Sequence, residues 1–126
     1  MIDVKKLLTK ILQSLIPSEA SGTLGTTTVV TSSDNHRCYL VKTGKTVRAY
    51  IGIGYHNGTT QLGSGTTFFT IPEGYRPSSQ KIFPAIAYRA TGVTICANVV
   101  INTNGVVTQS TAANITAIYA VAEWTV

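Results

Sequence analysis

The sequence predicts an all-β fold: an antiparallel β-sandwich or a Greek-key, jelly-roll-like barrel, preceded by a short N-terminal α-helix and assembled as a homotrimer. The composition is rich in Thr, Val, Ile and Gly and includes 6 Tyr, which favours pleated sheet over helix. Apolar and polar residues alternate through most of the chain, and turn residues recur at intervals of roughly ten residues, as is typical of sandwiches and barrels. Glu123 is the only charged side chain in residues 91–126. Because a small monomer needs more surface charge than that, we expect other subunits to cover part of this region.

The length of 126 residues suits one domain with an appendage, since a compact core typically takes about 100–150 residues. We expect a trimerising helix in residues 1–17, a linker in 18–25 and a β head domain in 26–126. The linker is expected because residues 18–25, SEASGTLG, are small and polar.

Residues 2–16 have the pattern of an amphipathic helix that ends at Pro17. As a heptad, the sequence places Leu8 and Leu15 at position a and Val4 and Ile11 at position d, a combination that disfavours dimers. An isolated helix of about 15 residues is marginal in water, so we expect it to pack against copies of itself. The alternative is a helix docked on the core of its own domain.

Strands are expected wherever the apolar period is two. Their predicted ranges are 26–33, 36–43, 46–54, 66–71, 81–90, 93–101, 106–109 and 115–126. Asn104 and Gly105 predict a type I′ hairpin turn between two of these strands. The last strand is apolar on both faces, which predicts a central strand or one covered by another subunit. The candidates for subunit contact on it are Tyr119, Val121 and Trp124, in addition to the four helix positions. For Trp124 the alternative is a place in the core.

The net charge of +5 does not indicate a nucleic-acid groove, because the basic residues are scattered and no run alternates them with aromatic residues. Lys10 and Gln13 interrupt the apolar N-terminal stretch, so we expect neither a signal peptide nor membrane insertion. Cys38 and Cys96 lack CxxC spacing. We expect two free, buried thiols, although the sequence does not exclude a pair.

Catalytic groups are sparse in this sequence. The carboxylates lie in separate segments, and neither His36 nor His56 accompanies a nucleophile motif. His36 and Cys38 alternate on one strand, which is too little for a metal site. We therefore expect no enzyme, no cofactor and no metal.

Residues 69–77 are FTIPEGYRP and residues 99–107 are VVINTNGVV. Together, over roughly residues 43–126, they resemble the C-terminal head domains of receptor-binding proteins in bacteriophage tail fibres and baseplates. The resemblance implies a homotrimer at the tip of a host-recognition organelle, bound to other tail or baseplate proteins. It also implies assembly in the bacterial host cytoplasm, a place in the virion, and contact with saccharides of the host cell wall.

The same segment has a structural interpretation. Pro72, Gly74 and Pro77 would hold Tyr75 and Arg76 between two rigid bends, which predicts a corner that stabilises the fold rather than a ligand site.

Saccharide recognition uses aromatic faces and planar polar groups on loops or strand ends. The first candidates are Tyr55, His56 and Asn57. The others are His36, Arg37, Tyr88 and Arg89. Two alternative functions remain: a purely structural trimerisation or capping module of a phage tail, and a secreted lectin-like bacterial domain.

Overall fold

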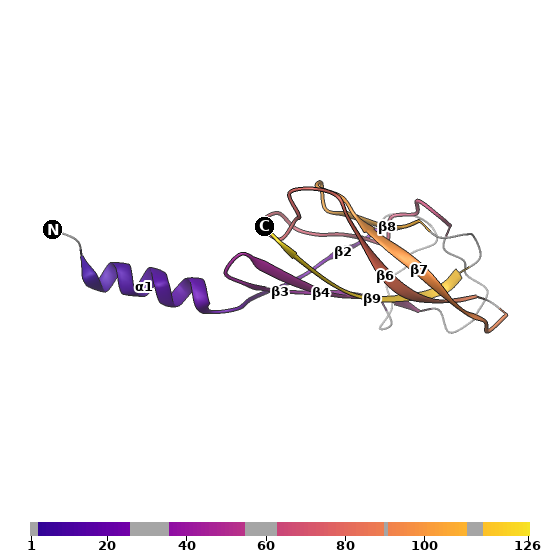
Figure 1. Cartoon of the computed structure of the whole chain (residues 1–126), viewed down its shortest axis with the longest axis horizontal. Helices are drawn as coiled ribbons and strands as arrows, with labels where there is room; N and C mark the ends of the chain where they lie inside the picture. The colour runs from indigo at the N-terminus through magenta and orange to yellow at the C-terminus, as the bar shows by residue number, and fades with distance from the viewer. Residues whose placement is uncertain (1–2, 26–35, 55–62, 90, 111–114) are drawn as a thin grey trace.

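The computed structural model describes residues 3–25, 36–54, 63–89, 91–110 and 115–126. This part of the chain holds one helix and one curled sheet whose strand pairs are antiparallel, in the order β1-β3-β4-β9-β6-β7-β8-β5-β2 (Figure 1). The elements are α1 (Val4–Leu15), β1 (Ser18–Ser21), β2 (Thr23–Leu24), β3 (Arg37–Thr43), β4 (Thr46–Gly54), β5 (Phe69–Thr70), β6 (Lys81–Arg89), β7 (Thr94–Ile101), β8 (Val106–Gln109) and β9 (Ile115–Thr125).

The all-β prediction is confirmed at this level. Six predicted strands appear as β3, β4, β6, β7, β8 and β9, with ends within one residue of the expected ones, whereas β5 is shorter than predicted. The predicted strand 26–33 and the Tyr55–Asn57 segment lie outside the described residues.

Helix α1 extends from one end of the sheet along the long axis of the molecule (Figure 1). Its first turn is capped by Asp3, whose side chain accepts a hydrogen bond from the Lys6 N–H at 3.1 Å. The apolar stripe stays exposed: the exposed fractions are 72% at Val4, 48% at Leu7, 54% at Leu8, 48% at Ile11, 53% at Leu12 and 64% at Leu15. The helix is therefore not docked on the core of its own domain.

The segment predicted as a linker instead forms two strands. β1 pairs with β3, and β2 pairs with β5, so one short stretch of chain joins the two ends of the strand order and the sheet curls. At the crossing, the Gly22 N–H donates to the Cys38 carbonyl at 2.8 Å, and a Cβ on Gly22 would lie only 2.8 Å from the Cys38 Cβ. The linker prediction is wrong because these strands arise from long-range pairing, to which small polar residues give no local signal.

The core lies on the inner face of the curled sheet. Val47, Ala49, Ile51 and Ile53 of β4 are buried, as their alternation predicted. On β9 the buried positions include Trp124, which is 4% exposed. Its Nε1–H donates to the Tyr75 carbonyl at 2.7 Å, and its ring centroid lies 6.2 Å from that of Phe83. Of the two expectations for Trp124, the core is correct and the subunit interface is not, because the residue is enclosed by its own chain.

The segment from Pro72 to Pro77 connects several strands. Arg76 Nε donates to the Ile71 carbonyl at 2.7 Å, and the Tyr75 hydroxyl is hydrogen-bonded to the Ser18 hydroxyl of β1 at 3.0 Å. Lys42 Nζ donates to the Gly74 carbonyl at 2.8 Å and lies 5.6 Å from the centre of the Tyr75 ring. With the bond from Trp124, these contacts join the segment to β1, β3 and β9.

The hairpin between β7 and β8 has a longer turn than predicted. The Gly105 N–H donates to the Asn102 carbonyl at 2.9 Å, so Thr103 and Asn104 form the centre of the turn and Gly105 follows it with φ 87°. This corrects the expected type I′ turn at Asn104-Gly105. The sequence NTNG fits both geometries, because a left-handed glycine also follows the turn in three-residue hairpin loops.

Candidate functional site

One row of outward-facing residues crosses five strands at mid-sheet. The strand register places Arg37 beside Gly52, Gly52 beside Tyr119, Tyr119 beside Ile86, and Ile86 beside Cys96. These positions alternate with core residues, so they form the outer face of the sheet.

A groove opens on this face where β6 and β9 separate. β6 pairs with β9 only over residues 86–89, and its residues 81–85 pair with β7 alone. Pro84 lies in this separated part, which suits a residue with no N–H to donate to a neighbouring strand. The outer groove has a volume of about 810 Å³ and is lined by Arg37, Tyr50, Ile51, Gly52, Pro84, Ala85, Ile86, Cys96, Tyr119, Ala120 and Val121.

The outer groove is apolar and aromatic. Among the described residues, Arg37 is the only charged one in its lining. The Tyr119 ring lies close over Gly52, where an added Cβ would be 3.1 Å from the ring Cδ1. The Tyr88 ring meets Tyr119 edge to face, with centroids 6.2 Å apart. The groove could accept an apolar protein surface, and its tyrosines could stack on a sugar ring.

A polar border separates the groove from the end of the sheet next to α1, which we call the proximal end. Arg48 of β4 and Glu123 of β9 form an exposed ion pair at 2.9 Å. Hydrogen bonds to Tyr50 and Glu123 raise the pKa of Arg48. A hydrogen bond to the Glu19 carboxylate raises the pKa of Tyr39 in the same part of the face. The border is therefore charged and solvated, in contrast to the groove.

Both cysteines are free, but only one is buried. Cys38 lies in the core, and burial raises the pKa of its thiol to about 12. Cys96 lies on the exposed side of β7 and lines the groove. The expectation of two buried thiols is wrong for Cys96, because the alternation along β7 turns this residue outward.

We expect Cys38 to resist thiol reagents as long as the domain is folded. The thiolate is the reactive species, and a pKa of about 12 leaves almost none of it at pH 8. In a Cys96→Ser variant, Ellman's reagent should find no reactive thiol at pH 8 or pH 9 and one thiol in urea. In the matched Cys38→Ser variant, Cys96 should react without unfolding when the protein is dilute enough to be a single chain, because Cys96 is exposed there. Reaction of Cys38 in the native Cys96→Ser protein would contradict its buried position.

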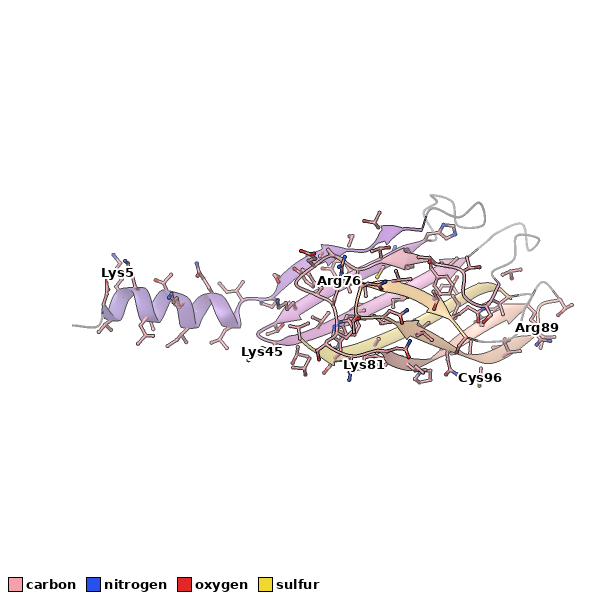
Figure 2. All side chains as sticks on the ribbon, turned by 90° about the horizontal axis from the view of Figure 1, so that it is seen from above. Lys5, Lys45, Arg76, Lys81, Arg89 and Cys96 are labelled. Atoms are coloured by element: carbon pink, nitrogen blue, oxygen red, sulfur yellow. The ribbon has the colours of Figure 1, made fainter. Side chains whose placement is uncertain are left out.

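The predicted saccharide residues are only partly brought together. Arg37 lies on the outer face, and Tyr88 and Arg89 are exposed at the end of β6. Figure 2 shows Arg89 at the end of the sheet remote from α1, which we call the distal end. Arg37 and Tyr88 are three strand spacings apart, or about 15 Å at 4.8 Å per spacing. His36 does not fit the expectation of a surface residue, because it is buried.

Tyr119 and Val121, two of the predicted subunit contacts, line the groove and are 45% and 63% exposed. Tyr50, Pro84, Ile86 and Cys96 were not predicted as site residues. One signal was available for them: the outward positions of the strand at residues 81–90, which include Pro84 and Ile86, are as apolar as the inward ones.

Among the described residues, no three of His, Cys, Asp and Glu lie close enough together to hold a metal ion. Within the same part of the chain, no helix has the length and apolar character needed to span a membrane. No family model matches this chain, and no curated protein matches it in sequence.

Proposed function

We propose that the chain is the homotrimeric, non-enzymatic head of a bacteriophage tail fibre or baseplate receptor-binding protein, and that it attaches to a saccharide of the host cell surface. The observation that carries the proposal is the exposed apolar stripe of α1. A 12-residue helix that stands off its own domain is marginal alone and becomes stable when copies of the stripe pack together. The resemblance of the 69–77 and 99–107 segments to phage heads supports the same assignment.

The arrangement of the molecule supports attachment at the distal end. α1 leaves the sheet at the proximal end, where other tail or baseplate proteins would be joined, and Arg89 lies at the opposite end (Figure 2). At that end Arg89 offers a planar donor and Tyr88 offers an aromatic face, and both are exposed at the end of β6. The proposal includes a jelly-roll-like barrel. The pairing of β1 with β3 and of β2 with β5 supports it, because residues 18–24 join the two ends of the strand order.

The second candidate is a purely structural trimerisation or capping module. It is favoured by the apolar lining of the outer groove, where the described part of the chain supplies only one charged residue to donate hydrogen bonds to sugar hydroxyls. The two functions make different predictions about ligand binding.

Binding to host cells or to a glycan array should fall about tenfold or more in a Tyr88→Ala, Arg89→Ala double variant, because one lost hydrogen bond to a charged group costs about 1.5–3 kcal/mol. Arg48→Ala is the control, since this exposed arginine lies on the same face but at the proximal border. A Tyr55→Ala, His56→Ala variant tests the first sequence candidates in the same assay. Absence of saccharide and cell binding by the wild-type trimer would favour the structural module.

A further inference from the structure

We infer that the outer groove faces the threefold axis and is covered by other copies of this chain, so that Ile86, Tyr119 and Val121 pack against their neighbours. The inference rests on the proposed homotrimer and adds the surface by which the heads meet. It makes the head itself part of the assembly, in addition to α1.

The exposed apolar side chains of the head gather on this face. Among the described residues of the sheet and its turns, all the large exposed hydrophobics except Val93 are outward-facing residues of β4, β6 and β9. They are Tyr50, Ile82, Ile86, Tyr88, Tyr119 and Val121, with exposed fractions of 40–63%.

The area of this surface fits a subunit contact. Tyr88 lies at the distal edge of this face. The other five side chains have roughly 200 Å² each and are about half exposed, so together they offer on the order of 500 Å². A standard interface takes about 800 Å² from each partner, so the face supplies most of what a stable contact needs. It also lies in the upper part of the range for the largest apolar patch on a typical monomer, about 300–600 Å².

The charge pattern suits a second copy. Among the described residues, Arg37 is the single charged residue of the groove lining, and few charged residues are typical of the core of a protein interface. The Arg48–Glu123 pair at the border has both signs and is about half exposed, with side-chain exposures of 55% and 51%. Each copy therefore presents an apolar centre with charges of both signs at its proximal border.

The direction of α1 also favours another copy of this chain as the partner that covers the groove. The helix continues the long axis of the head, so a parallel bundle of three helices would place the heads side by side (Figure 1). Each head must then present one long side to its neighbours. The outer groove is the apolar side available for this.

Cys96 gives a test in the full chain, because it is exposed in a single copy, lines the groove and lies on the outside of the sheet (Figure 2). At concentrations where light scattering gives a trimer, we expect Cys96 to react with Ellman's reagent at least tenfold more slowly than in the same chain diluted to the monomer. An Ile86→Asp variant should weaken the trimer at least tenfold on dilution. Ile86 is 54% exposed, so the folded monomer should tolerate the change, which a thermal melt checks.

Val93→Asp is the matched control. Val93 is 53% exposed but lies in the turn before β7, away from the groove. This variant should keep both the trimer and the protection of Cys96. A trimer in which Cys96 reacts as fast as in the dilute monomer, or an Ile86→Asp trimer as tight as the wild type, would overturn the inference.

Further outcomes separate this inference from the proposed function. A protected Cys96 in a trimer that binds no saccharide supports the subunit contact and removes the receptor-binding role. Protection of Cys96 by an added saccharide in the dilute monomer would overturn the contact and assign the groove to the ligand. A wild-type chain that is monomeric at micromolar concentration would overturn both proposals.

Discussion

Deletion of residues 1–17 is expected to leave the head folded and to weaken the trimer at least 100-fold, giving a monomer at micromolar concentration. The helix stripe is 48–72% exposed in the single chain, so its removal takes nothing from the core. Burying one such side chain between subunits contributes about 1.5–3 kcal/mol, and the stripe has six of them in each chain. The shortened chain keeps Ser18, the hydrogen-bond partner of Tyr75. Light scattering measures the assembly, and circular dichroism with a thermal melt measures the fold.

A point variant makes the same test without shortening the chain. Leu8→Asp places a charge in the stripe and should also give a monomer, whereas Thr9→Asp places the same charge beside the stripe and should leave the trimer intact. If the shortened chain were still a full-strength trimer, the helix would not be the trimerising element and the contact would lie in the head alone.

Gly105→Ala is expected to lower the free energy of unfolding by about 3 kcal/mol or more. Gly105 has φ 87°, and holding a non-glycine residue in such a conformation costs about 1–3 kcal/mol. An added Cβ would also collide with the Ile71 carbonyl and with Arg76 Nε. The hydrogen bond between these two groups would break, leaving a partly buried carbonyl without its donor at a cost of about 1–3 kcal/mol. Urea unfolding followed by the fluorescence of Trp124, the single tryptophan, measures the change.

The control for this variant is Gly92→Ala. Gly92 has φ 82°, but an added Cβ would meet no atom within 4 Å. Gly92→Ala should therefore lower the free energy of unfolding only by the cost of holding one non-glycine residue in the left-handed conformation, about 1–2 kcal/mol. Equal effects at the two glycines would show that the contact of Gly105 with Ile71 and Arg76 contributes nothing to stability.

The strands could be predicted because their pattern is local. In β4, Val47, Ala49, Ile51 and Ile53 face the core and have the same period in the sequence. β1 and β2 could not be found in this way. They are short and polar, and their strand conformation comes from pairing with β3 and β5, which lie much farther along the chain. The position of the turn at Gly105 was predicted correctly. Its type was not, because the sequence NTNG is compatible with two turn geometries.

Sequence analysis predicted residues of the candidate site only where the pattern within a single strand was enough to identify them. The apolar residues on both faces of β9 singled out Tyr119 and Val121, which line the groove. The pattern could not show which face its own chain covers, so Trp124 was a candidate both for the subunit contact and for the core, to which it belongs. Ile86 and Cys96 join Tyr119 only through strand pairing, and a single sequence does not contain the register.

The short segment that joins the two ends of the strand order also determines how the head would bear a mechanical load. A pull through α1 reaches the sheet at Ser18, the first residue of β1, and α1 continues the long axis of the sheet (Figure 1). The hydrogen bonds between β1 and β3 run across the strands, so such a pull loads all of them in shear at once instead of opening them one after another. Beyond Gly22 the same segment pairs with β5, and the tension is shared with the other end of the sheet. The head is thus attached to its helix in the geometry that best resists being peeled away.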